Sequence, residues 1–375
     1  MTDPPSPSDH PRQARRPRVS VHTITYNHEQ YIEAAVESAL SQETRFEIEM
    51  VVGEDCSTDG TRAKLLELQR RHPDRLRLLL HPTNVGIMRN FVATLEACRG
   101  EYIALLEGDD YWTDPGKLQK QVELLDAHPE CAFCHHNVLK HVEGEAGPRT
   151  LWHPSNAPSR WQSLDELLRS NLAISCSTVF RAGLIGTFPD WFLQASAPDW
   201  LLHILNAQHG RIWYDNSVMA AYRVHGTSVW STSPRITQLE RMIANAGLVR
   251  GSLTPQQQKT LDGSIARWQE EVIERLIESG RSGEAADYSG KHLPDSRALS
   301  RLEAFFAGLR CEERGDRRGA SRQLFRALVT GIGRTRIRST DVLLALFRNL
   351  TPRLYSLTRD AWRRRANDNP PGTLQ

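Results

Sequence analysis

Apolar strand segments and helical segments alternate along the first 127 residues of this 375-residue chain. We expect strands at 19–24, 46–52, 76–80 and 101–107, and helices at 29–42, 61–71, 86–98 and 114–127. Asp114 and Pro115 are expected to start the last of these helices, with Asp114 as N-cap. Such regular alternation predicts an α/β fold, in which helices flank a mostly parallel, doubly wound sheet.

The strand at 101–107 ends in a cluster of acidic residues. Its apolar part, 102–106, is continuous rather than alternating, as in a strand buried on both faces. Glu107, Gly108, Asp109 and Asp110 follow directly. Ligands of open α/β sheets bind outside the carboxyl ends of the strands, and clustered carboxylates repel one another unless a cation or a proton relieves them. The pattern therefore predicts a site for a divalent cation, Mg²⁺ above all, and a diphosphate.

The second strand also ends in carboxylates, Glu54 and Asp55, before the turn residues 56–60. A helix-capping turn would explain Ser57 and Asp59. It would not explain two acids at the ligand edge of the sheet. We therefore expect the carboxylate of Asp55 to accept the ring N–H of a uracil or thymine base.

Two further groups are candidates for donor contacts. Thr23, Tyr26 and Asn27 lie at the end of the first strand, where a base could stack on the tyrosine ring. Arg89, just after Asn84-Val85-Gly86, could place a guanidinium near a diphosphate. The alternatives are an ordinary loop with a tyrosine and a solvated arginine.

The charge of the chain is unevenly distributed. Residues 301–375 contain sixteen arginines and seven acids, a net charge of +9, so the first 300 residues carry −7 of the total of +2. A basic tail fits anionic lipid, nucleic acid or an acidic partner, or simply a solvated helical face. We expect no nucleic-acid partner, and the six cysteines do not suggest a disulfide framework.

Three parts are expected: a disordered basic arm at 1–17, an α/β domain at 18–235 and a helical region at 236–375. Residues 278–293 and 313–328 echo each other faintly at a spacing of 35, near the period of a helix-turn-helix repeat. The segment 341–365 is typical either of an interfacial membrane helix or of an ordinary amphipathic helix packed on its own domain.

No apolar run reaches the ~18 residues of a membrane span and no secretory signal is visible. The expected location is the cytoplasm, with peripheral contact on the inner face of the plasma membrane if the tail binds lipid.

Together, VSVHTITYNHEQYI, EIEMVVGEDCSTDGT, NVGIMRN and YIALLEGDDYW resemble, in order and spacing, the family 2 glycosyltransferases of GT-A fold. The resemblance covers about residues 18–230. It implies a nucleotide-diphosphate sugar as donor, with UDP favoured, a Mg²⁺ or Mn²⁺ cofactor and inversion at the sugar carbon. The implied acceptor is a glycan or a lipid-linked saccharide.

The resemblance also assigns residues. Thr23, Tyr26, Asp55 and Glu54 would hold the nucleoside. The D-x-D motif of the family falls on Glu107-Gly108-Asp109, with Glu in place of the first Asp. Asp109 is the first choice for metal ligand, with Asp110 beside it, while Glu107 would contact the ribose or the metal.

The reaction also needs a base that takes the proton of the attacking hydroxyl. The resemblance places it at Asp199, before Trp200, and Asp190 before Trp191 is the competing candidate. An N-cap aspartate with a core tryptophan is the alternative for Asp199. In Arg223-Val224-His225, the resemblance places a closing motif that covers the donor phosphates. His225 could then bind the metal or the diphosphate, or be structural.

Two other functions compete with transfer. A non-catalytic scaffold could keep the fold and recruit partners through its helical region. A nucleotidyltransferase should carry a Gly-rich phosphate loop with Lys or Arg after the first strand, and TITYNHEQ has neither feature. Cys131-Ala132-Phe133-Cys134-His135 fits the spacing of a haem attachment motif, but it lies where the next strand of the sheet is expected.

Overall fold

The computed structural model describes residues 16–144, 150–228 and 230–292, with a few single residues between 304 and 324. Most of the basic arm, part of the second copy of the echo and the segment 341–365 therefore lie outside the described residues. The chain consists of two compact units. One contains the sheet and consists of Met1–Ser233 with Ala244–Leu261; the other consists of Pro234–Ile243 and the chain from Asp262 onward.

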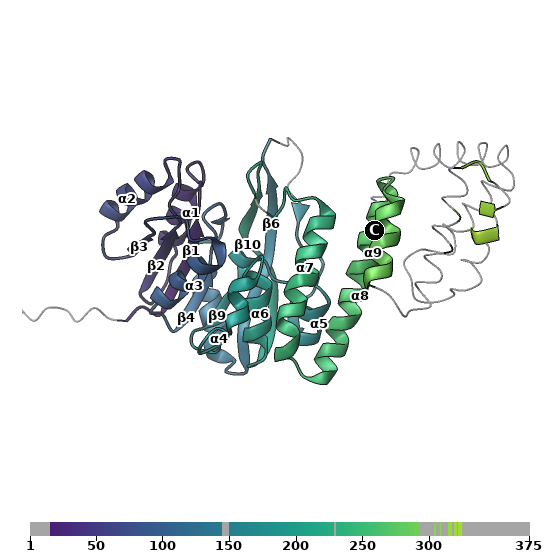
Figure 1. The fold of residues 1–375 in the computed structure, drawn as a ribbon. Helices are drawn as coiled ribbons and strands as arrows, with labels where there is room; N and C mark the ends of the chain where they lie inside the picture. The colour runs from purple at the N-terminus through teal and green to yellow at the C-terminus, as the bar shows by residue number, and fades with distance from the viewer. Residues whose placement is uncertain are drawn as a thin grey trace, which may run out of the picture. The chain divides into compact units, whose positions relative to one another are not determined.

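A mixed sheet forms the core of the first unit (Figure 1). Its strands are β1 Val19–Thr25, β2 Ile48–Glu54, β3 Leu76–Leu80, β4 Tyr102–Leu105, β5 Tyr111–Trp112, β6 Cys131–Val142, β7 Thr150–Leu151, β8 Arg160–Gln162, β9 Val179–Arg181 and β10 Arg211–Val224. The strand order is β3-β2-β1-β4-β9-β6-β10-β5, with β7 on β6 and β8 on β10. The first four strands in this order, β3 to β4, are parallel, as are β6 and β10, while β9 runs antiparallel to both of its neighbours.

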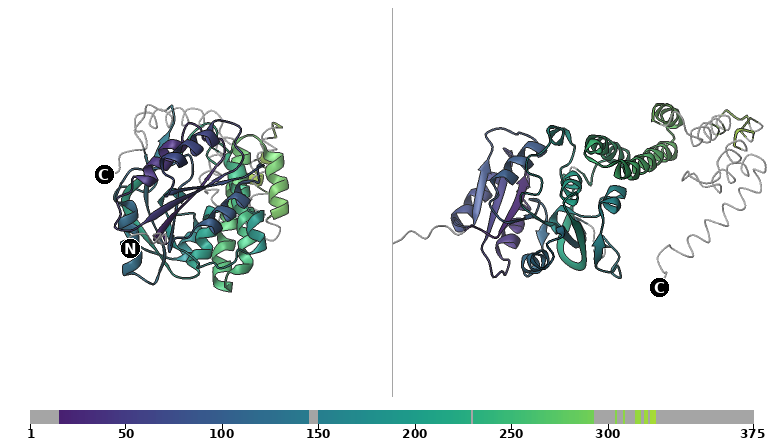
Figure 2. Two further views of the ribbon diagram at one scale, coloured as in Figure 1. Left: turned by 90° about the vertical axis from the view of Figure 1, so that its left-hand side faces the viewer. Right: turned by 90° about the horizontal axis from the view of Figure 1, so that it is seen from below.

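Helices cover both faces of the sheet (Figures 1 and 2). The α-helices are α1 Ile32–Leu40, α2 Thr61–Arg71, α3 Ile87–Ala97, α4 Lys117–Ala127, α5 Leu164–Arg169, α6 Asp199–Ala207, α7 Arg235–Val249, α8 Pro255–Glu278 and α9 Ser282–His292, and the short 3-10 helices are Ser175–Ser177, Asp190–Gln194 and Arg250–Ser252. The alternation expected from the sequence is confirmed, and α2 and β3 agree with it at both ends. The described residues from 235 to 292 contain helices alone, as expected.

Alternate residues of the central strands pack on opposite faces, as the period of a strand requires. Val21 of β1 belongs to a buried apolar cluster with residues of α1, α2 and α4. The next residue, His22, faces the other side and contacts the ring of Phe91 on α3, with 4.4 Å between ring centroids. On that same side, Phe133 of β6 stacks on His203 of α6. The two helical layers fix the central strands, so the loops at their carboxyl ends start from rigid positions.

The start of α4 differs from the sequence prediction. The helix begins at Lys117 with Gly116 as N-cap, and the Asp114 carboxylate instead accepts the N–H of Gly116 at 2.8 Å within the preceding turn. Asp114 as N-cap was therefore wrong. Two turn residues intervene because the aspartate closes a local turn on its own backbone before the helix starts.

Lys117 is an unusual member of the core. Its side chain is fully buried, and its Nζ lies 4.1 Å from the centroid of the Trp112 ring. This amine has no hydrogen-bond partner among the described residues. Burial lowers the pKa of Lys117 to about 7. The folded state therefore holds a lysine that loses its proton far more easily than one in water.

Replacing Lys117 by methionine should raise the free energy of unfolding at pH 7 by about 1–3 kcal/mol, because a buried donor without a partner is removed. The folded pKa of about 7 lies below the value of 10.5 for a free lysine. Between these values the unfolded state binds more protons, so the wild-type protein gains stability as pH rises through this window. The difference in the free energy of unfolding between Lys117→Met and wild type should therefore become smaller as pH rises. Urea denaturation at pH 7 and pH 9.5 measures both effects.

Lys120→Met is the matched control, because Lys120 lies on the same helix, is half exposed and pairs with Asp114 at 2.5 Å. It should change stability by less than about 1 kcal/mol. A Lys117→Met protein that is less stable than wild type at pH 7 would contradict the account of this lysine.

Candidate functional site

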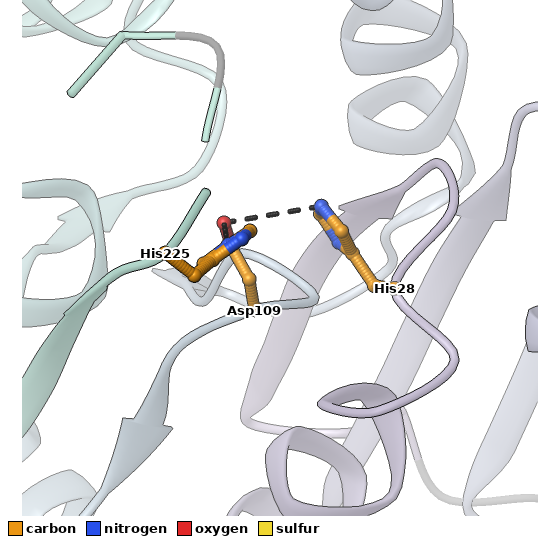
Figure 3. A group of neighbouring side chains, drawn as sticks. All are labelled: His28, Asp109 and His225. Atoms are coloured by element: carbon orange, nitrogen blue, oxygen red, sulfur yellow. Dashed lines mark hydrogen bonds and ion pairs between the residues drawn. The ribbon is translucent and has the colours of Figure 1, made fainter. Parts of the chain in front are cut away.

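Three loops at the carboxyl edge of the sheet converge on one carboxylate (Figure 3). His28 lies after β1, Asp109 after β4 and His225 directly after β10. The Nε2 atom of His225 lies 3.0 Å from Oδ2 of Asp109, and Nε2 of His28 lies 3.8 Å from the same oxygen. One ligand atom of each residue lies within 4.8 Å of the others, close enough for a single metal ion.

The side chains of His28, Asp109 and His225 are exposed to the degree that suits a binding site for a metal ion. The side chains of His28 and Asp109 are each 19% exposed, whereas that of His225 is 1% exposed. Burial opposes ionisation of Asp109, but the hydrogen bond with His225 and the charges of His28 and His225 outweigh it and lower the pKa of the carboxyl. Burial also lowers the pKa of His28. An ionised carboxylate beside a neutral imidazole is the state in which both groups bind a cation.

Local backbone geometry brings the loops together. Gly108 is buried and donates its N–H to the carbonyl of Ile24 in β1 at 3.1 Å. A Cβ atom at this position would lie 2.6 Å from Oγ1 of Thr25 and 2.9 Å from Nδ1 of His28. Only glycine therefore allows the acidic loop to approach the β1 loop this closely.

Asp110 is turned away from this group. Its side chain is buried, and Oδ1 accepts the backbone N–H of Arg223 at 2.8 Å. Burial, with the charge of Asp109, raises the pKa of Asp110 well above its usual range. The structure thus uses Asp110 to tie the acidic loop to β10, rather than bringing it to His28 and His225.

Glu107 is half-buried beside the same acids. Burial raises its pKa well above its usual range, and the charges of Asp109, Asp110 and Asp199 add to the effect. The first acid of the motif therefore holds its proton more readily than a free glutamate. In that state it could donate a hydrogen bond to a sugar or ribose oxygen.

Arg223 is held beside the acidic loop. Its guanidinium lies over the rings of Tyr31 and Tyr111, at 5.2 Å and 4.4 Å from their centroids. Nη1 donates to the backbone carbonyl of Asp109 at 2.9 Å. A positive group fixed in this way next to Asp109 is suited to an anionic ligand such as a diphosphate.

The two candidates for the base differ in their surroundings. Asp199 is half-buried at the first residue of α6, and Oδ2 accepts Nδ2 of Asn171 at 3.0 Å. Burial raises its pKa, and its charge reaches Glu107. Asp190 is exposed at the start of a short 3-10 helix. Asp199 does not cap α6, since Pro198 is the N-cap, so the capping alternative no longer accounts for it.

The loops after β1 and β2 lie together. The N–H of Asn27 bonds to Oγ of Ser57 at 3.0 Å, and its Oδ1 accepts the N–H of Thr58 at 2.8 Å. Asn27 has a φ of 57°, a left-handed conformation that asparagine tolerates better than most residues. Tyr26, just before it, is 43% exposed. Asn27 therefore shapes the loop, and its neighbour Tyr26 presents an open aromatic ring.

Asp55 organises the loop before α3. Its two carboxylate oxygens accept the N–H groups of Val85 at 2.7 Å and of Gly86 at 3.0 Å. Each carboxylate oxygen has two lone pairs, so capacity for a further donor remains. Arg89, one turn into α3, has an exposed side chain.

Two predicted contacts are placed inside the protein. Glu54 is fully buried, forms an ion pair with Arg62 and accepts the N–H of Ser57 at 2.6 Å. Thr23 lies within β1 with no exposed surface, and its hydroxyl has no hydrogen-bond partner in the described part of the chain. The structure thus does not bring Glu54 and Thr23 to the exposed edge with Tyr26, and the neighbouring Asp55 is itself only 3% exposed.

Sequence reasoning missed His28 as a site residue. In the sequence it is only one more residue of the loop after the first strand, next to Tyr26 and Asn27. Its position at a strand end was a signal, but nothing in the order of residues shows that the imidazole reaches over Gly108 to Asp109.

Comparisons with known proteins identify a family model, related sequences and a similar fold. Residues 20–184 match the family model described as Glycosyl transferase family 2. An uncharacterized protein of Mycobacterium tuberculosis is 39% identical over 215 residues, which are 57% of this chain and 61% of that protein. TuaG of Bacillus subtilis, provisionally named as a teichuronic acid biosynthesis glycosyltransferase, is 39% identical over 120 residues, 32% of this chain and 45% of TuaG. The chain thus spans less than two thirds of these relatives.

A crystal structure of S. aureus TarS 1–349 with UDP-GlcNAc has a similar fold. The TM-score is 0.55 at 19% identity, and the match covers 82% of this chain and 90% of that chain. The GT-A fold expected from the sequence is confirmed, and residues 20–184 match the family that the sequence motifs resemble.

Asp110→Asn should bind Mn²⁺ within about threefold of wild type, because an amide keeps an oxygen for the Arg223 N–H and resembles a carboxyl whose pKa is raised. Asp109→Asn should weaken Mn²⁺ binding by more than about tenfold, since it removes the charge that both histidines face. Calorimetric titration with Mn²⁺ compares the two variants. An equal loss in both would show that Asp110 is a ligand as well.

Proposed function

Because residues 20–184 are a glycosyl transferase family 2 domain, we propose that this chain is an inverting transferase that moves a sugar from a nucleotide-diphosphate donor to a saccharide acceptor. The observation that carries the proposal is the carboxylate of Asp109 at the carboxyl edge of the sheet, which two imidazoles face and beside which Arg223 is held. Hexosyl and N-acetylhexosaminyl groups are the sugar classes that we propose.

The nucleoside end of the donor is assigned to the loops after β1 and β2. The exposed ring of Tyr26 offers a stacking surface, and Asp55 has acceptor capacity for the ring N–H of uracil. Uracil and thymine both carry such a donor between two carbonyl oxygens, and the family that the motifs resemble favours UDP. The UDP-GlcNAc bound by TarS supports this choice.

The diphosphate end is assigned to the group around Asp109. The ligand atoms of His28, Asp109 and His225 fit a divalent cation in number and kind. Such a cation would supply Lewis-acid stabilisation of the diphosphate oxygens. Arg223, held between two tyrosine rings, provides a second positive group for the same phosphates.

Asp199 is assigned as the base. A sugar hydroxyl becomes a nucleophile when the Asp199 carboxylate accepts its proton, while the new C–O bond forms as the bond to the diphosphate breaks. Attack from the face opposite the diphosphate inverts the sugar carbon. Asn171 holds Oδ2 of Asp199 at 3.0 Å and so orients the carboxylate.

The acceptor class is proposed from the relatives and not from a contact. The name of TuaG connects that protein to the biosynthesis of teichuronic acid. A growing glycan or a lipid-linked saccharide is the corresponding acceptor here. Within the described ranges, no helix combines the length and the apolar composition needed to cross a membrane. Peripheral membrane contact through the basic tail remains a prediction.

The competing function is a non-catalytic scaffold of the same fold. A scaffold would need neither of two features of this site. One is Asp199 with a raised pKa and a charge that reaches Glu107, and the other is the pair of imidazoles that face the carboxylate of Asp109. Hydrolysis of UDP-GlcNAc to UDP in the presence of Mn²⁺ separates the two functions, because a scaffold would release no UDP.

Asp199→Asn should lower the rate of transfer by about 10²–10⁴-fold, the usual contribution of a positioned base. UDP binding should stay within about threefold of wild type, because Asp199 lies apart from the nucleoside loops. Asp190→Asn is the matched control and should transfer normally. The base assignment would be wrong if Asp190→Asn lost activity and Asp199→Asn kept it.

The transfer rate should fall on the acid side of its pH profile, because Asp199 must be ionised to accept a proton. Burial raises its pKa above the usual aspartate range, so the acid limb should lie above pH 4. Rates of UDP release from pH 4 to pH 9, at saturating donor and Mn²⁺, measure this limb. A rate that does not change down to pH 4 would exclude a base with a raised pKa.

A further inference from the structure

We propose that His28 is a third protein ligand of the cation, and that the resulting set of two imidazoles and one carboxylate selects Mn²⁺ over Mg²⁺. The inference rests on the proposed function in placing a cation at Asp109, and it names which ion and which additional residue. His28 lies outside the acidic motif and in a different loop from either of the other two ligands.

The geometry places both imidazoles on the same oxygen. Nε2 of His225 and Nε2 of His28 lie 3.0 Å and 3.8 Å from Oδ2 of Asp109, and the rings stand nearly perpendicular, at 89°. The two nitrogens thus approach one carboxylate oxygen from different directions. One cation among the three atoms could accept all three lone pairs.

Each imidazole is oriented by a threonine hydroxyl on its other nitrogen. Nδ1 of His28 lies 3.2 Å from Oγ1 of Thr25, and Nδ1 of His225 lies 2.9 Å from Oγ1 of Thr227. A hydroxyl that accepts the Nδ1 proton fixes the tautomer whose Nε2 lone pair is available to a metal. Histidines that bind metals in proteins are generally held in this way. The same arrangement on both rings is the observation that most favours ligation.

The backbone of His28 is fixed as firmly as its ring. Its N–H bonds to Oγ1 of Thr61 at 2.8 Å, and the left-handed Asn27 precedes it. Gly108 leaves the space that the ring occupies, since a Cβ there would lie 2.9 Å from Nδ1 of His28. The imidazole is therefore positioned before any ligand arrives, which reduces the entropy lost on binding.

The donor atoms decide which ion is preferred. Mg²⁺ favours oxygen ligands and keeps several waters, so a site with two nitrogen ligands suits it poorly. Imidazole suits first-row transition ions, whereas carboxylate is also a good ligand for Mn²⁺. A site with two nitrogens and one oxygen should therefore bind Mn²⁺ more tightly than Mg²⁺. Co²⁺ should bind more tightly still, following the general order of affinities.

The alternative is a cluster held by hydrogen bonds and charge alone. In that case protonated His28 and His225 neutralise Asp109, and no cation is needed there. The two explanations predict different effects of removing His28 on Mn²⁺ affinity. A histidine that balances the charge of Asp109 competes with a cation, so its removal should not weaken Mn²⁺ binding. A histidine that is a ligand contributes to binding, so its removal should weaken it.

Calorimetric titration of the full chain with Mn²⁺ and with Mg²⁺, each with and without UDP, tests the inference. Wild type should bind Mn²⁺ at least tenfold more tightly than Mg²⁺. His28→Ala should lower Mn²⁺ affinity by at least tenfold and reduce the preference over Mg²⁺. Thr25→Val, which keeps the shape and loses the hydroxyl, should lower Mn²⁺ affinity by about tenfold or more.

His209→Ala and Thr94→Val are matched controls outside the site. His209 is exposed after α6, and Thr94 is buried within α3. Both should bind Mn²⁺ as wild type does. Equal affinities of wild type for the two ions, or unchanged Mn²⁺ affinity in both His28→Ala and Thr25→Val, would overturn the inference.

The failure of the inference can be told from the failure of the proposed function. Release of UDP from UDP-GlcNAc that proceeds equally with Mg²⁺, and that survives His28→Ala, would reject the third ligand while transferase activity stands. Mn²⁺ binding that depends on His28, in a protein that neither binds UDP nor releases it from a donor, would reject the function while the metal site stands.

Discussion

Three acidic side chains share one edge of the sheet, and the rest of the site depends on how their mutual repulsion is relieved. Burial and neighbouring charges raise the pKa of Glu107 and of Asp110, whereas His225 and His28 lower that of Asp109. The three acids therefore do not ionise with the same ease. Because only Asp109 is favoured in its ionised form among them, it is the natural centre for a cation.

The different ionisation of the three acids explains why distant segments of the chain meet at the site. Asp110 accepts the N–H of Arg223, a residue that lies 113 positions later in the chain. That bond fixes the end of the acidic loop against the end of β10, which brings Arg223 and His225 to Asp109. The glycine between the acids lets the β1 loop close from the other side. Arg223 and the imidazoles of His28 and His225 thus lie around Asp109. None of these three residues belongs to the loop that carries Asp109.

Much of the fold could be predicted from the sequence because its elements are locally encoded. The helix at 61–71 and the strand at 76–80 carry their own apolar periodicity, and the acids of the motif mark the end of a strand. The antiparallel β9 between β4 and β6 was not predicted, because strand order depends on contacts between segments far apart. Asp114 was misread since an aspartate before a proline fits both a helix cap and a turn.

The site could be predicted only as a set of strand ends. Asp109 and Asp110 are adjacent and chemically identical, and only the fold shows that one faces the histidines and the other the backbone of Arg223. Thr23 and Glu54 stand at strand ends in the sequence, yet both side chains are fully buried. His28 was missed because its partner lies in another loop. Residue type and spacing identify the edge that binds the ligand, whereas side-chain direction requires the packed structure.

The most direct measurement is a crystal structure of the protein with Mn²⁺ and UDP, with anomalous scattering used to locate the manganese. The account predicts one manganese peak within coordination distance of the Asp109 carboxylate and of a diphosphate oxygen of UDP. A diphosphate bound without manganese at Asp109, or a manganese peak elsewhere in the protein, would contradict it.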